Sequence, residues 1–469
     1  MLEQDKFIEL LSREERSGEC WSIKLNGTPI WPLIRFSAYF AWRNKKGSYG
    51  DVKDVRLKVN ADNLAKARIE QRESSQRKRI LLISRDEGLN DRVDGKLFDK
   101  FISSIRILLE TVHDISLVAI GPKVDRFDAT VYLTSLLQSV SKNMGVNVPN
   151  GEVKILDAFL RRFGAQTGLD IPLQTILNAY AQFLLGRTFW TKVINTYKPD
   201  YVISTCFYIP LFAGACAAAR DCGVCFVDLQ HGRVGEAHPV MSNWDFSEAD
   251  PDALSLFPTE FWCWQDENKD RIKQTWKGMI DLPKAKTFGN PWQYLRATNV
   301  VELSSKTETH IQEPKLFTIL IALQPIDNSL PRFFVNALNC LDKKRVWIRP
   351  HPHQMGEISQ IEMHLSDLGL ADFVIRSDQD LYSEFGKIDV LVTAFSTVGS
   401  EAAIFGVPVI LVHPNATVAF DGLIDGQNVM YCNSADDSIA ALQSLSARVI
   451  KVERSQSCGF SNFNTDCIV

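Results

Sequence analysis

Two series of short apolar runs alternate with longer amphipathic stretches along this chain. In the first series the apolar runs are "RILLIS", "ISLVAIG", "PDYVISTC", "GVCFVDLQHG" and "EFWCW", with "VKILD" as a weaker member. Stretches with helical periodicity lie between them, namely "DKFISSIRILLETV", "DATVYLTSLLQSVSKNM", "TFWTKVINTY" and "FAGACAAARD". Short apolar runs closed by turn-forming residues are typical of strands buried on both faces of a parallel sheet. Their alternation with helices predicts a doubly wound α/β domain.

The same alternation restarts after a polar stretch near residue 300. The strand-like runs are now "LFTILIALQ", "RVWIRP", "DFVIRS", "DVLVTAF" and "VPVILV". The helix-like stretches are "SLPRFFVNALNCL", "QIEMHLSDLG", "DLYSEFGKI" and "STVGSEAAIFG". We therefore expect a second Rossmann-like domain, and the predicted fold class is α/β with two such domains in tandem.

The remaining segments complete the predicted domain organisation. The N-terminal part contains "CWSIKLNGTPIWPLIRF", in which "NGTP" predicts a turn between two aromatic-rich pieces. The prediction is an N-terminal helical and aromatic extension (1–78), a first Rossmann-like domain (79–295), a linker (296–312), a second Rossmann-like domain (313–450) and a polar tail (451–469).

Composition narrows the class of protein. A hydrophobic content of 45% and a charged content of 23% over 469 residues are those of a globular protein with more than one core. The formal charge of -4 provides no general attraction to nucleic acid. The charged start and the lack of an apolar run of about 20 residues predict no signal peptide and no membrane span. Ten cysteines without a disulfide rhythm indicate a reduced, cytoplasmic protein.

In open parallel sheets, ligands bind beyond the carboxyl ends of the strands, so the strand-end residues are the candidates for chemistry. In the second domain, "RPHPH" places Arg349, His351 and His353 at alternate positions of an extended segment. Arginine and histidine donors on a turn stiffened by prolines suit a phosphate, although a lone histidine is usually structural.

Two further strand ends of the second domain carry polar side chains. Ser396 and Thr397 begin a helix, where free N–H groups favour an anion, but the hydroxyls could act only as an N-cap. Glu401 lies one turn along the helix and suits a ribose diol, and Gln324 ends the first strand. We expect these residues to bind a nucleotide.

The first domain offers two candidate acid–base clusters. "SRDEG" places Asp86 and Glu87 after the first strand, where a plain turn is an equal alternative. "VDLQHGRVGEAHP" places Asp228 and His231 after the fifth strand, on a segment too rich in titratable groups for a plain connection. The spacing of these groups matches no known metal site, and we expect no metal.

The order of "RPHP" followed by "DVLVTAFSTVGSEAAIFGVPVI" resembles the donor-binding half of GT-B-fold sugar transferases of bacterial surface polysaccharides. The resemblance covers roughly residues 315 to 415. Within this range the sequence is similar to capsule β-Kdo transferases, sialyl- and polysialyltransferases and CDP-glycerol glycerophosphotransferases. It implies that two Rossmann-like domains face each other across a cleft, and that the His-Pro and Ser/Thr pairs contact the phosphate of a nucleotide sugar.

The resemblance also implies roles in the first domain. Asp228 would be the nucleophile of a retaining enzyme, whereas Asp86, Glu87 or His231 would be the base of an inverting one. The "FGNPW" segment, with Asn290, is similar to the hinge and cleft wall of these proteins, which adds Asn290 to the donor-binding residues.

The predicted function is transfer of a sugar from a nucleotide donor to a growing surface polysaccharide such as capsule or lipopolysaccharide. A CMP-linked acidic sugar such as Kdo or sialic acid is favoured, with UDP- and CDP-linked donors open. The acceptor would be an oligosaccharide or lipid-linked glycan, so attachment at the inner face of the cytoplasmic membrane stays open. The alternatives are a CDP-glycerol-type polyol-phosphate transferase, a UDP-sugar 2-epimerase and a non-catalytic scaffold.

Overall fold

The computed structural model describes most of the chain. The described residues are 4–43, 57–59, 77–85, 89–110, 112–120, 126, 131–132, 147–232, 234, 240–278, 281–298, 300–303, 316–326, 328–370, 372–377, 380–420 and 422–449. The polar tail predicted for 451–469 lies outside them.

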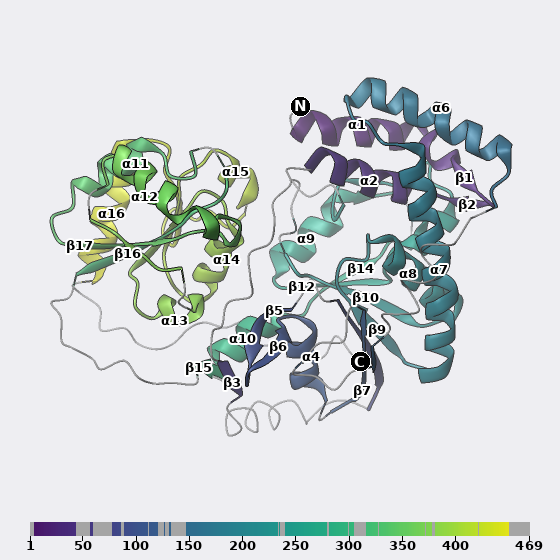
Figure 1. Cartoon of the computed structure of the whole chain (residues 1–469), viewed down its shortest axis with the longest axis horizontal. Coiled ribbons are helices and arrows are strands. Elements are labelled where there is room, and N and C mark those ends of the chain that lie inside the picture. The colour runs from purple at the N-terminus through teal and green to yellow at the C-terminus, as the bar shows by residue number, and fades with distance from the viewer. Residues whose placement is uncertain are drawn as a thin grey trace.

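The first domain is built on a parallel sheet of seven strands in the order β14-β12-β10-β9-β4-β7-β8. The chain enters at β4, runs outward through β7 and β8, returns to β9 beside β4 and then continues to the opposite edge (Figure 1). The strand order therefore reverses between β4 and β9, and this is where a doubly wound sheet binds its ligand. The bounds are β4 (Arg79–Arg85), β7 (Asp114–Ile120), β8 (Val131–Tyr132), β9 (Tyr201–Ser204), β10 (Cys225–Leu229), β12 (Glu260–Cys263) and β14 (Lys284–Thr287).

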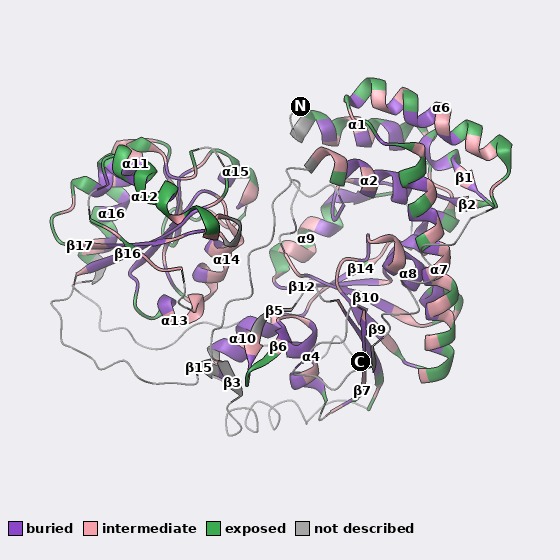
Figure 2. Ribbon diagram, viewed as in Figure 1, coloured by how far each residue is buried: buried purple, intermediate pink, exposed green. Residues whose placement is uncertain are grey.

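Both faces of this sheet are covered, as the apolar runs predict. Along β4, Leu81 and Ile83 point into one core with α7 (Leu173–Tyr197) and α8 (Pro210–Asp221). Ile80 and Leu82 point into a second core with α4 (Ile102–Leu109) and α10 (Pro291–Ala297). In Figure 2 the central strands and parts of the helices beside them are purple, the colour of buried residues.

Two segments of the first domain form a different element from the one predicted. "VKILD" is not a strand but part of α6 (Asn150–Thr167), because its apolar residues continue at helical spacing. Leu156, Phe159, Leu160 and Phe163 are buried, whereas Ile155 is exposed. The third strand is β8, inside a stretch predicted as helix, since two residues are too few to show alternation.

The N-terminal extension packs against the first domain. It consists of α1 (Gln4–Ser17), a short 3₁₀ turn η1 (Cys20–Ser22), the hairpin β1 (Lys24–Leu25) and β2 (Thr28–Pro29), and α2 (Trp31–Arg43). The predicted turn is present: Asn26 and Gly27 connect the hairpin with φ angles of 47° and 78°, which Asn-Gly adopts readily. Apolar residues of α1 and α2 join the same core as α7 and α8, so the extension is part of the folded domain.

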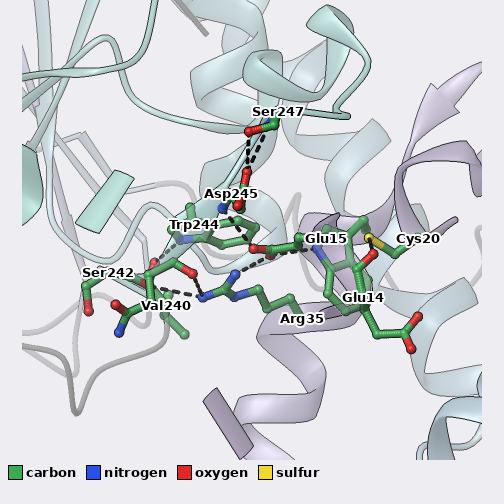
Figure 3. Close-up of polar contacts among 11 residues, drawn as sticks. Glu14, Glu15, Cys20, Arg35, Val240, Ser242, Trp244, Asp245 and Ser247 are labelled. Carbon is green, nitrogen blue, oxygen red and sulfur yellow. Dashed lines mark hydrogen bonds and ion pairs between the residues drawn. The ribbon is translucent and has the colours of Figure 1, made fainter. Parts of the chain in front are cut away.

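A buried ion pair fixes the extension in place (Figure 3). The Arg35 guanidinium donates to the Glu15 carboxylate, and neither side chain is exposed. Glu15 also accepts from the Asp245 N–H at 2.9 Å, while Arg35 donates to the Ser242 carbonyl at 3.0 Å and stacks 3.8 Å from the centre of the Trp244 ring. Burial raises the pKa of Glu15 and lowers that of Arg35, and their mutual attraction opposes both shifts. The pair connects α1 and α2 to the segment around residue 244.

The second domain contains a parallel sheet of six strands in the order β18-β17-β16-β19-β20-β21. The chain again starts centrally, at β16, and the order reverses between β16 and β19. The bounds are β16 (Phe317–Ala322), β17 (Lys344–Arg349), β18 (Val374–Ile375), β19 (Val390–Thr393), β20 (Val409–Leu411) and β21 (Val429–Tyr431), and the helices are α11 (Arg332–Asn339), α12 (Ile358–Asp367), α13 (Leu381–Phe385), α14 (Thr397–Ile404), α15 (Asn415–Ala419) and α16 (Ala435–Val449). The predicted fold class, α/β with two Rossmann-like domains and an N-terminal helical extension, is confirmed.

The two domains touch through α10 and the start of α13 (Figure 1). Arg296 forms a two-pronged ion pair with Asp380, with distances of 2.6 and 3.0 Å and side chains only 5% and 8% exposed. The Trp292 ring packs edge-on against Tyr382, with ring centres 6.0 Å apart. Within the predicted linker 296–312, the structure has β15 (Val301–Leu303), which pairs with β3 (Leu57–Val59) in a small sheet with β5 (Leu89–Val93) and β6 (Lys96–Asp99).

None of the helices in the described part of the chain combines the length and apolar character needed to cross a lipid bilayer.

Candidate functional sites at the strand ends

In the first domain, the carboxyl ends of β9 and β10 bring four chemically active side chains together. β9 ends at Ser204 and the chain turns through Cys206 and Tyr208 before α8 begins at Pro210. The neighbouring strand β10 contains Asp228 near its end and leads directly into His231. The two strands are adjacent, so these side chains meet at the edge of the sheet beside the β4–β9 reversal.

The imidazole of His231 is the centre of this cluster. Its Nε2 lies 3.1 Å from the Cys206 Sγ and 3.2 Å from the Tyr208 hydroxyl oxygen. The Tyr208 hydroxyl is also 3.4 Å from the Cys206 sulfur. On the other side of the ring, Nδ1 lies 3.4 Å from the carbonyl oxygen of Leu229, which favours a proton on Nδ1.

Cys206 has a backbone conformation that non-glycine residues rarely adopt. Its φ angle is +61°, in the left-handed region. Such a conformation costs about 1–3 kcal/mol and persists where the surrounding structure enforces it, often at functional sites. Here it directs the side chain of a strand-to-helix turn toward His231, much as a sharp turn presents the nucleophile in other α/β folds.

Asp228 lies behind this cluster and is fully buried. Its Oδ1 accepts the Phe207 N–H at 3.0 Å, whereas its Oδ2 has no hydrogen-bond partner among the described residues. Burial raises the pKa of Asp228 to about 7, and the nearby His231 charge acts in the opposite direction. A carboxyl group that titrates near neutrality is suited to proton transfer or to tuning a neighbouring base.

The charge states of His231 and Cys206 depend on each other. Burial opposes a charged His231, but the Cys206 sulfur and Asp228 outweigh it and raise the pKa of His231 to about 9. Burial likewise opposes a thiolate at Cys206, but His231 and Arg85 outweigh it and lower the pKa of that thiol. The two groups therefore favour a thiolate–imidazolium pair.

Gln230 holds the segment between Asp228 and His231 against the next strand. Its side-chain oxygen accepts the Trp264 N–H and its carbonyl accepts the Trp264 indole N–H, both at 2.8 Å. The Trp264 ring stacks on Phe101, which in turn packs edge-on to His231 with ring centres 6.4 Å apart. An aromatic wall therefore fixes the position of His231.

The structure places Asp228 and His231 in one cluster, and their catalytic roles stay predictions. Asp86 and Glu87 lie outside the described residues, so their roles stay predictions. Cys206 and Tyr208 were missed, because no motif surrounds them. The signal available was their position just after the strand-like run "PDYVIS", at the end of a sheet where ligands bind.

In the second domain, Gln324 and the loop that precedes Ser396 meet at the reversal between β16 and β19. The Gln324 side-chain oxygen accepts the Phe395 N–H at 2.8 Å, joining the loops after the two strands. Ser396 is the N-cap of α14, and its hydroxyl accepts the Val398 N–H at 3.4 Å. Thr397 is the first residue of that helix and is partly exposed. The cap interpretation of Ser396 is thus present in the structure, at a helix N-terminus that also favours an anion.

Arg349, at the end of β17, is part of a buried charge network. It donates to one Glu384 oxygen at 3.0 Å, and Arg376 donates to the other at 2.9 Å, while Glu384 is fully buried. Arg376 also stacks over the Trp347 ring at 4.5 Å. Two guanidinium groups and one carboxylate give this trio a formal charge of +1. The carboxyl ends of β17 and β18 therefore carry net positive charge.

His351 follows Arg349 on a tight turn. Its N–H donates to the Gln354 side chain at 3.1 Å, and its carbonyl accepts the Gln354 N–H at 2.7 Å. The turn continues as a short 3₁₀ helix, η4 (Pro352–Glu357), and His351 is half-buried. The side chain of His353 lies outside the described residues.

The other two predicted donor-binding residues lie near the contact between the domains. The Glu401 carboxylate accepts the Tyr382 hydroxyl at 2.6 Å, so the structure gives it a partner on α13. Asn290 is the N-cap of α10 and accepts the Gln293 N–H at 3.2 Å. Both positions adjoin the Trp292–Tyr382 contact: Glu401 bonds to Tyr382, and Asn290 caps the helix that contains Trp292.

No group of three or more histidine, cysteine, aspartate or glutamate side chains suited to a metal ion occurs within the described ranges. The expectation that no metal takes part stays a prediction.

No protein-family model and no curated protein matches this chain. Among solved structures, it is similar to the UDP-GlcNAc 2-epimerase from Neisseria meningitidis bound to UDP-GlcNAc, with 11% identity, 81% of this chain and 94% of that chain covered, and a TM-score of 0.49. The UDP-GlcNAc 2-epimerase from Methanocaldococcus jannaschii gives 12% identity, 82% and 96% coverage, and a TM-score of 0.46. MurG from Acinetobacter baumannii gives 14% identity, with 80% of this chain and 91% of that chain covered and a TM-score of 0.39. Identities and TM-scores this low carry no argument about activity.

Proposed function

We propose that this protein is a nucleotide-sugar-dependent glycosyltransferase of the GT-B type. The observation that carries the proposal is the distribution of polar groups over two doubly wound sheets. The first sheet carries an acid–base cluster around His231 at the strand ends, and the second carries Arg349, Ser396 and Gln324. A transfer between two substrates needs both a proton-transfer group and a site that holds the departing nucleotide.

The second domain suits the nucleotide. The Arg349–Glu384–Arg376 trio and the N-terminus of α14 provide positive potential where a diphosphate or monophosphate would lie. This potential stabilises the negative charge that grows on the phosphate as the bond to the sugar breaks. His351 and Thr397 add donors at the same strand ends.

The first domain suits the acceptor. In the thiolate–imidazolium state, the Cys206 thiolate can take the proton of an acceptor hydroxyl, while the buried Asp228 stabilises the His231 imidazolium beside it. Because Asp228 is fully buried, we assign it this supporting role in the proposal and place His231 at the substrate.

The finer part of the proposal concerns the substrates. We infer that the donor is a nucleotide-activated acidic sugar, with CMP as the favoured nucleotide, and that the acceptor is a surface glycan. The support is the net positive charge of the arginine trio, which suits a donor with an additional carboxylate.

Titration calorimetry with CMP, UDP, CDP and GDP tests the nucleotide site. We expect one nucleotide to bind clearly better than the others, and His351→Ala to weaken its binding by about ten-fold or more without loss of folding. His364→Ala is the matched control, because His364 is an exposed histidine of the same domain. Absence of binding by every nucleotide, or equal binding by wild type and His351→Ala, would contradict the proposed site.

Measuring turnover of the donor with and without an acceptor then distinguishes a transferase from an epimerase and from a scaffold. A transferase consumes its donor rapidly only when an acceptor is present. Rapid turnover of a UDP-sugar without any acceptor would instead indicate an epimerase. Tight nucleotide binding without turnover under any condition would indicate a scaffold.

A further inference from the structure

The turn after β9 holds a thiol in contact with an imidazole, and this contact does not depend on any transferase role. Cys206 Sγ and His231 Nε2 are 3.1 Å apart, within the range of a hydrogen bond to sulfur. The positive φ of Cys206 keeps its side chain at the strand end, and the Tyr208 hydroxyl contacts both partners. The sulfur, the imidazole and the phenol thus form one compact cluster.

The groups that face this cluster come from several elements. Arg85 at the end of β4 acts on the sulfur, and Asp228 of β10 acts on the imidazole. Tyr39 of α2 acts on Tyr208. The positive charges of Arg85 and His231 act on the Cys206 sulfur. The unpartnered Oδ2 of the buried Asp228 adds negative potential on the side of His231. This arrangement favours negative charge on sulfur and positive charge on nitrogen.

Access distinguishes Cys206 from half of the cysteines that the structure describes, namely the buried Cys20, Cys216, Cys263 and Cys432. Cys206 and His231 are partly exposed. Cys222 and Cys225 are partly exposed as well, but burial raises the pKa of both thiols. Burial raises the pKa of Cys216 well above its ordinary value, so that thiol is inert in the folded state. Cys340 is exposed, and its sulfur donates to the Asn336 carbonyl at 3.4 Å.

From the Cys206–His231 contact, the turn that presents the sulfur and its partial exposure, we propose that Cys206 is a nucleophilic thiolate and a site of covalent modification by small peroxides. The inference does not require the protein to be a glycosyltransferase.

The step balances within the cluster and its named reactant. The thiolate sulfur attacks one oxygen of hydrogen peroxide, an S–O bond forms, and the O–O bond breaks with its electron pair on the departing oxygen. The sulfur is oxidised by two electrons and the peroxide is reduced. The departing hydroxide takes the proton of the His231 imidazolium, which leaves water, a sulfenic acid at Cys206 and a neutral imidazole. A low-molecular-weight thiol then condenses with the sulfenic acid to give a mixed disulfide and water. A second such thiol attacks the mixed disulfide, releases the Cys206 thiolate and leaves as the small-molecule disulfide, which restores the pair.

Site-resolved alkylation of the full-length protein with iodoacetamide tests the thiolate. At about pH 6 we expect Cys206 to react about ten-fold or more faster than Cys340, because an ordinary exposed thiol is almost entirely protonated at that pH. The His231→Asn substitution should slow the alkylation of Cys206 by a similar factor and leave the alkylation rate of Cys340 unchanged. Continued protection of Cys216, which is buried in α8 of the same domain as His231, reports that the variant is folded.

A second measurement, on the wild type alone, does not depend on any variant. After brief exposure to hydrogen peroxide, the sulfenic-acid reagent dimedone should label Cys206 before it labels Cys340. A Cys206 alkylation rate at or below that of Cys340 at about pH 6 would overturn the proposal. Absence of a dimedone label at Cys206 would overturn its peroxide part.

Discussion

Asp228 shows how one buried carboxyl group ties stability to pH. Its pKa rises from 3.8 to about 7 on folding, because burial disfavours the charged form. A group with a raised pKa stabilises the folded state fully below its unfolded pKa, and this contribution is lost as the pH rises through the folded value. Its contribution therefore falls between about pH 4 and pH 7, in contrast to a salt-bridged aspartate.

Replacing Asp228 with asparagine tests this. Relative to Asp228→Asn, the wild type should lose up to about 4 kcal/mol of unfolding free energy between about pH 4 and pH 7. Chemical denaturation across this range measures the difference. Asp170→Asn is the control, since Asp170 is exposed, and its profile should run parallel to that of the wild type. A parallel profile for Asp228→Asn as well would show that the carboxyl is not perturbed.

The Glu15–Arg35 pair gives a second prediction at the scale of residues. Glu15→Gln leaves the fully buried Arg35 without its counter-charge, which costs about 3–5 kcal/mol of unfolding free energy. The comparison is Arg187→Met, which removes a pair with Asp221 whose side chains are about 40% exposed. That change should cost less than about 1 kcal/mol. Equal losses from the two substitutions, measured by urea unfolding, would argue against a role of Glu15 in fixing the extension.

At the scale of elements, α7 and α8 approach each other so closely that only glycine fits at Gly186 and Gly214, where the two helices cross. A Cβ on Gly214 would lie 2.4 Å from the Phe183 carbonyl oxygen, and one on Gly186 would lie 2.3 Å from the Leu211 carbonyl oxygen. Both neighbours are backbone atoms, which cannot rotate away. The crossing of the two helices, which covers one face of the first sheet, therefore depends on these two positions.

Gly214→Ala should accordingly destabilise the protein by more than about 2 kcal/mol, because the helices must separate. Gly151→Ala in α6 is the matched control, since nothing lies within 4 Å of its added Cβ. That control should be neutral or stabilise the helix by about 0.5–1 kcal/mol. Thermal unfolding of the two variants, compared with wild type, checks the contrast, and a stable Gly214→Ala would rule out the close crossing.

The sequence predicts the elements of this protein best where they are regular. The strands β4, β9, β16 and β19 are apolar on both faces and were all identified. β8 and β14 were not, because two residues and the polar run "KAKT" show no strand pattern. The placement of candidate residues at strand ends was predictable where a visible motif follows the strand, as at Asp228 and Arg349, and their roles stay predictions. Cys206 depends on a turn geometry, and the partners Glu384 and Tyr382 depend on packing, neither of which follows from spacing along the chain.

At the scale of the whole molecule, the contact between the domains rests on the Arg296–Asp380 pair and on the rings around it. Arg296 lies 5.5 Å from the Trp292 ring centre and 5.2 Å from that of Tyr382. Arg296→Met keeps much of the apolar volume but removes the charge, leaving a nearly buried Asp380 unpaired.

We expect Arg296→Met to lower the cooperativity of unfolding and to broaden the small-angle scattering profile, because the two domains lose their described ion pair. Each domain should keep its own core, so far-ultraviolet circular dichroism should not change. Arg332→Met is the control, since Arg332 is a cation of the second domain whose guanidinium donates to the Asp367 carbonyl at 3.3 Å, away from the Arg296–Asp380 pair. A scattering profile identical to wild type would show that the ion pair does not set the domain arrangement.

The Asp380 carboxylate both pairs with Arg296 of the first domain and caps the N-terminus of α13. The same oxygen that pairs with Arg296 accepts the Ser383 N–H at 2.8 Å and so caps α13. One turn further along α13 is Glu384, the shared acceptor of Arg349 and Arg376. A movement that separates the domains removes the counter-charge of a helix cap, and the end of that helix holds the cations proposed to meet the nucleotide. The ion pair between the domains and the charge trio at the proposed donor site are thus joined by one five-residue segment, 380–384.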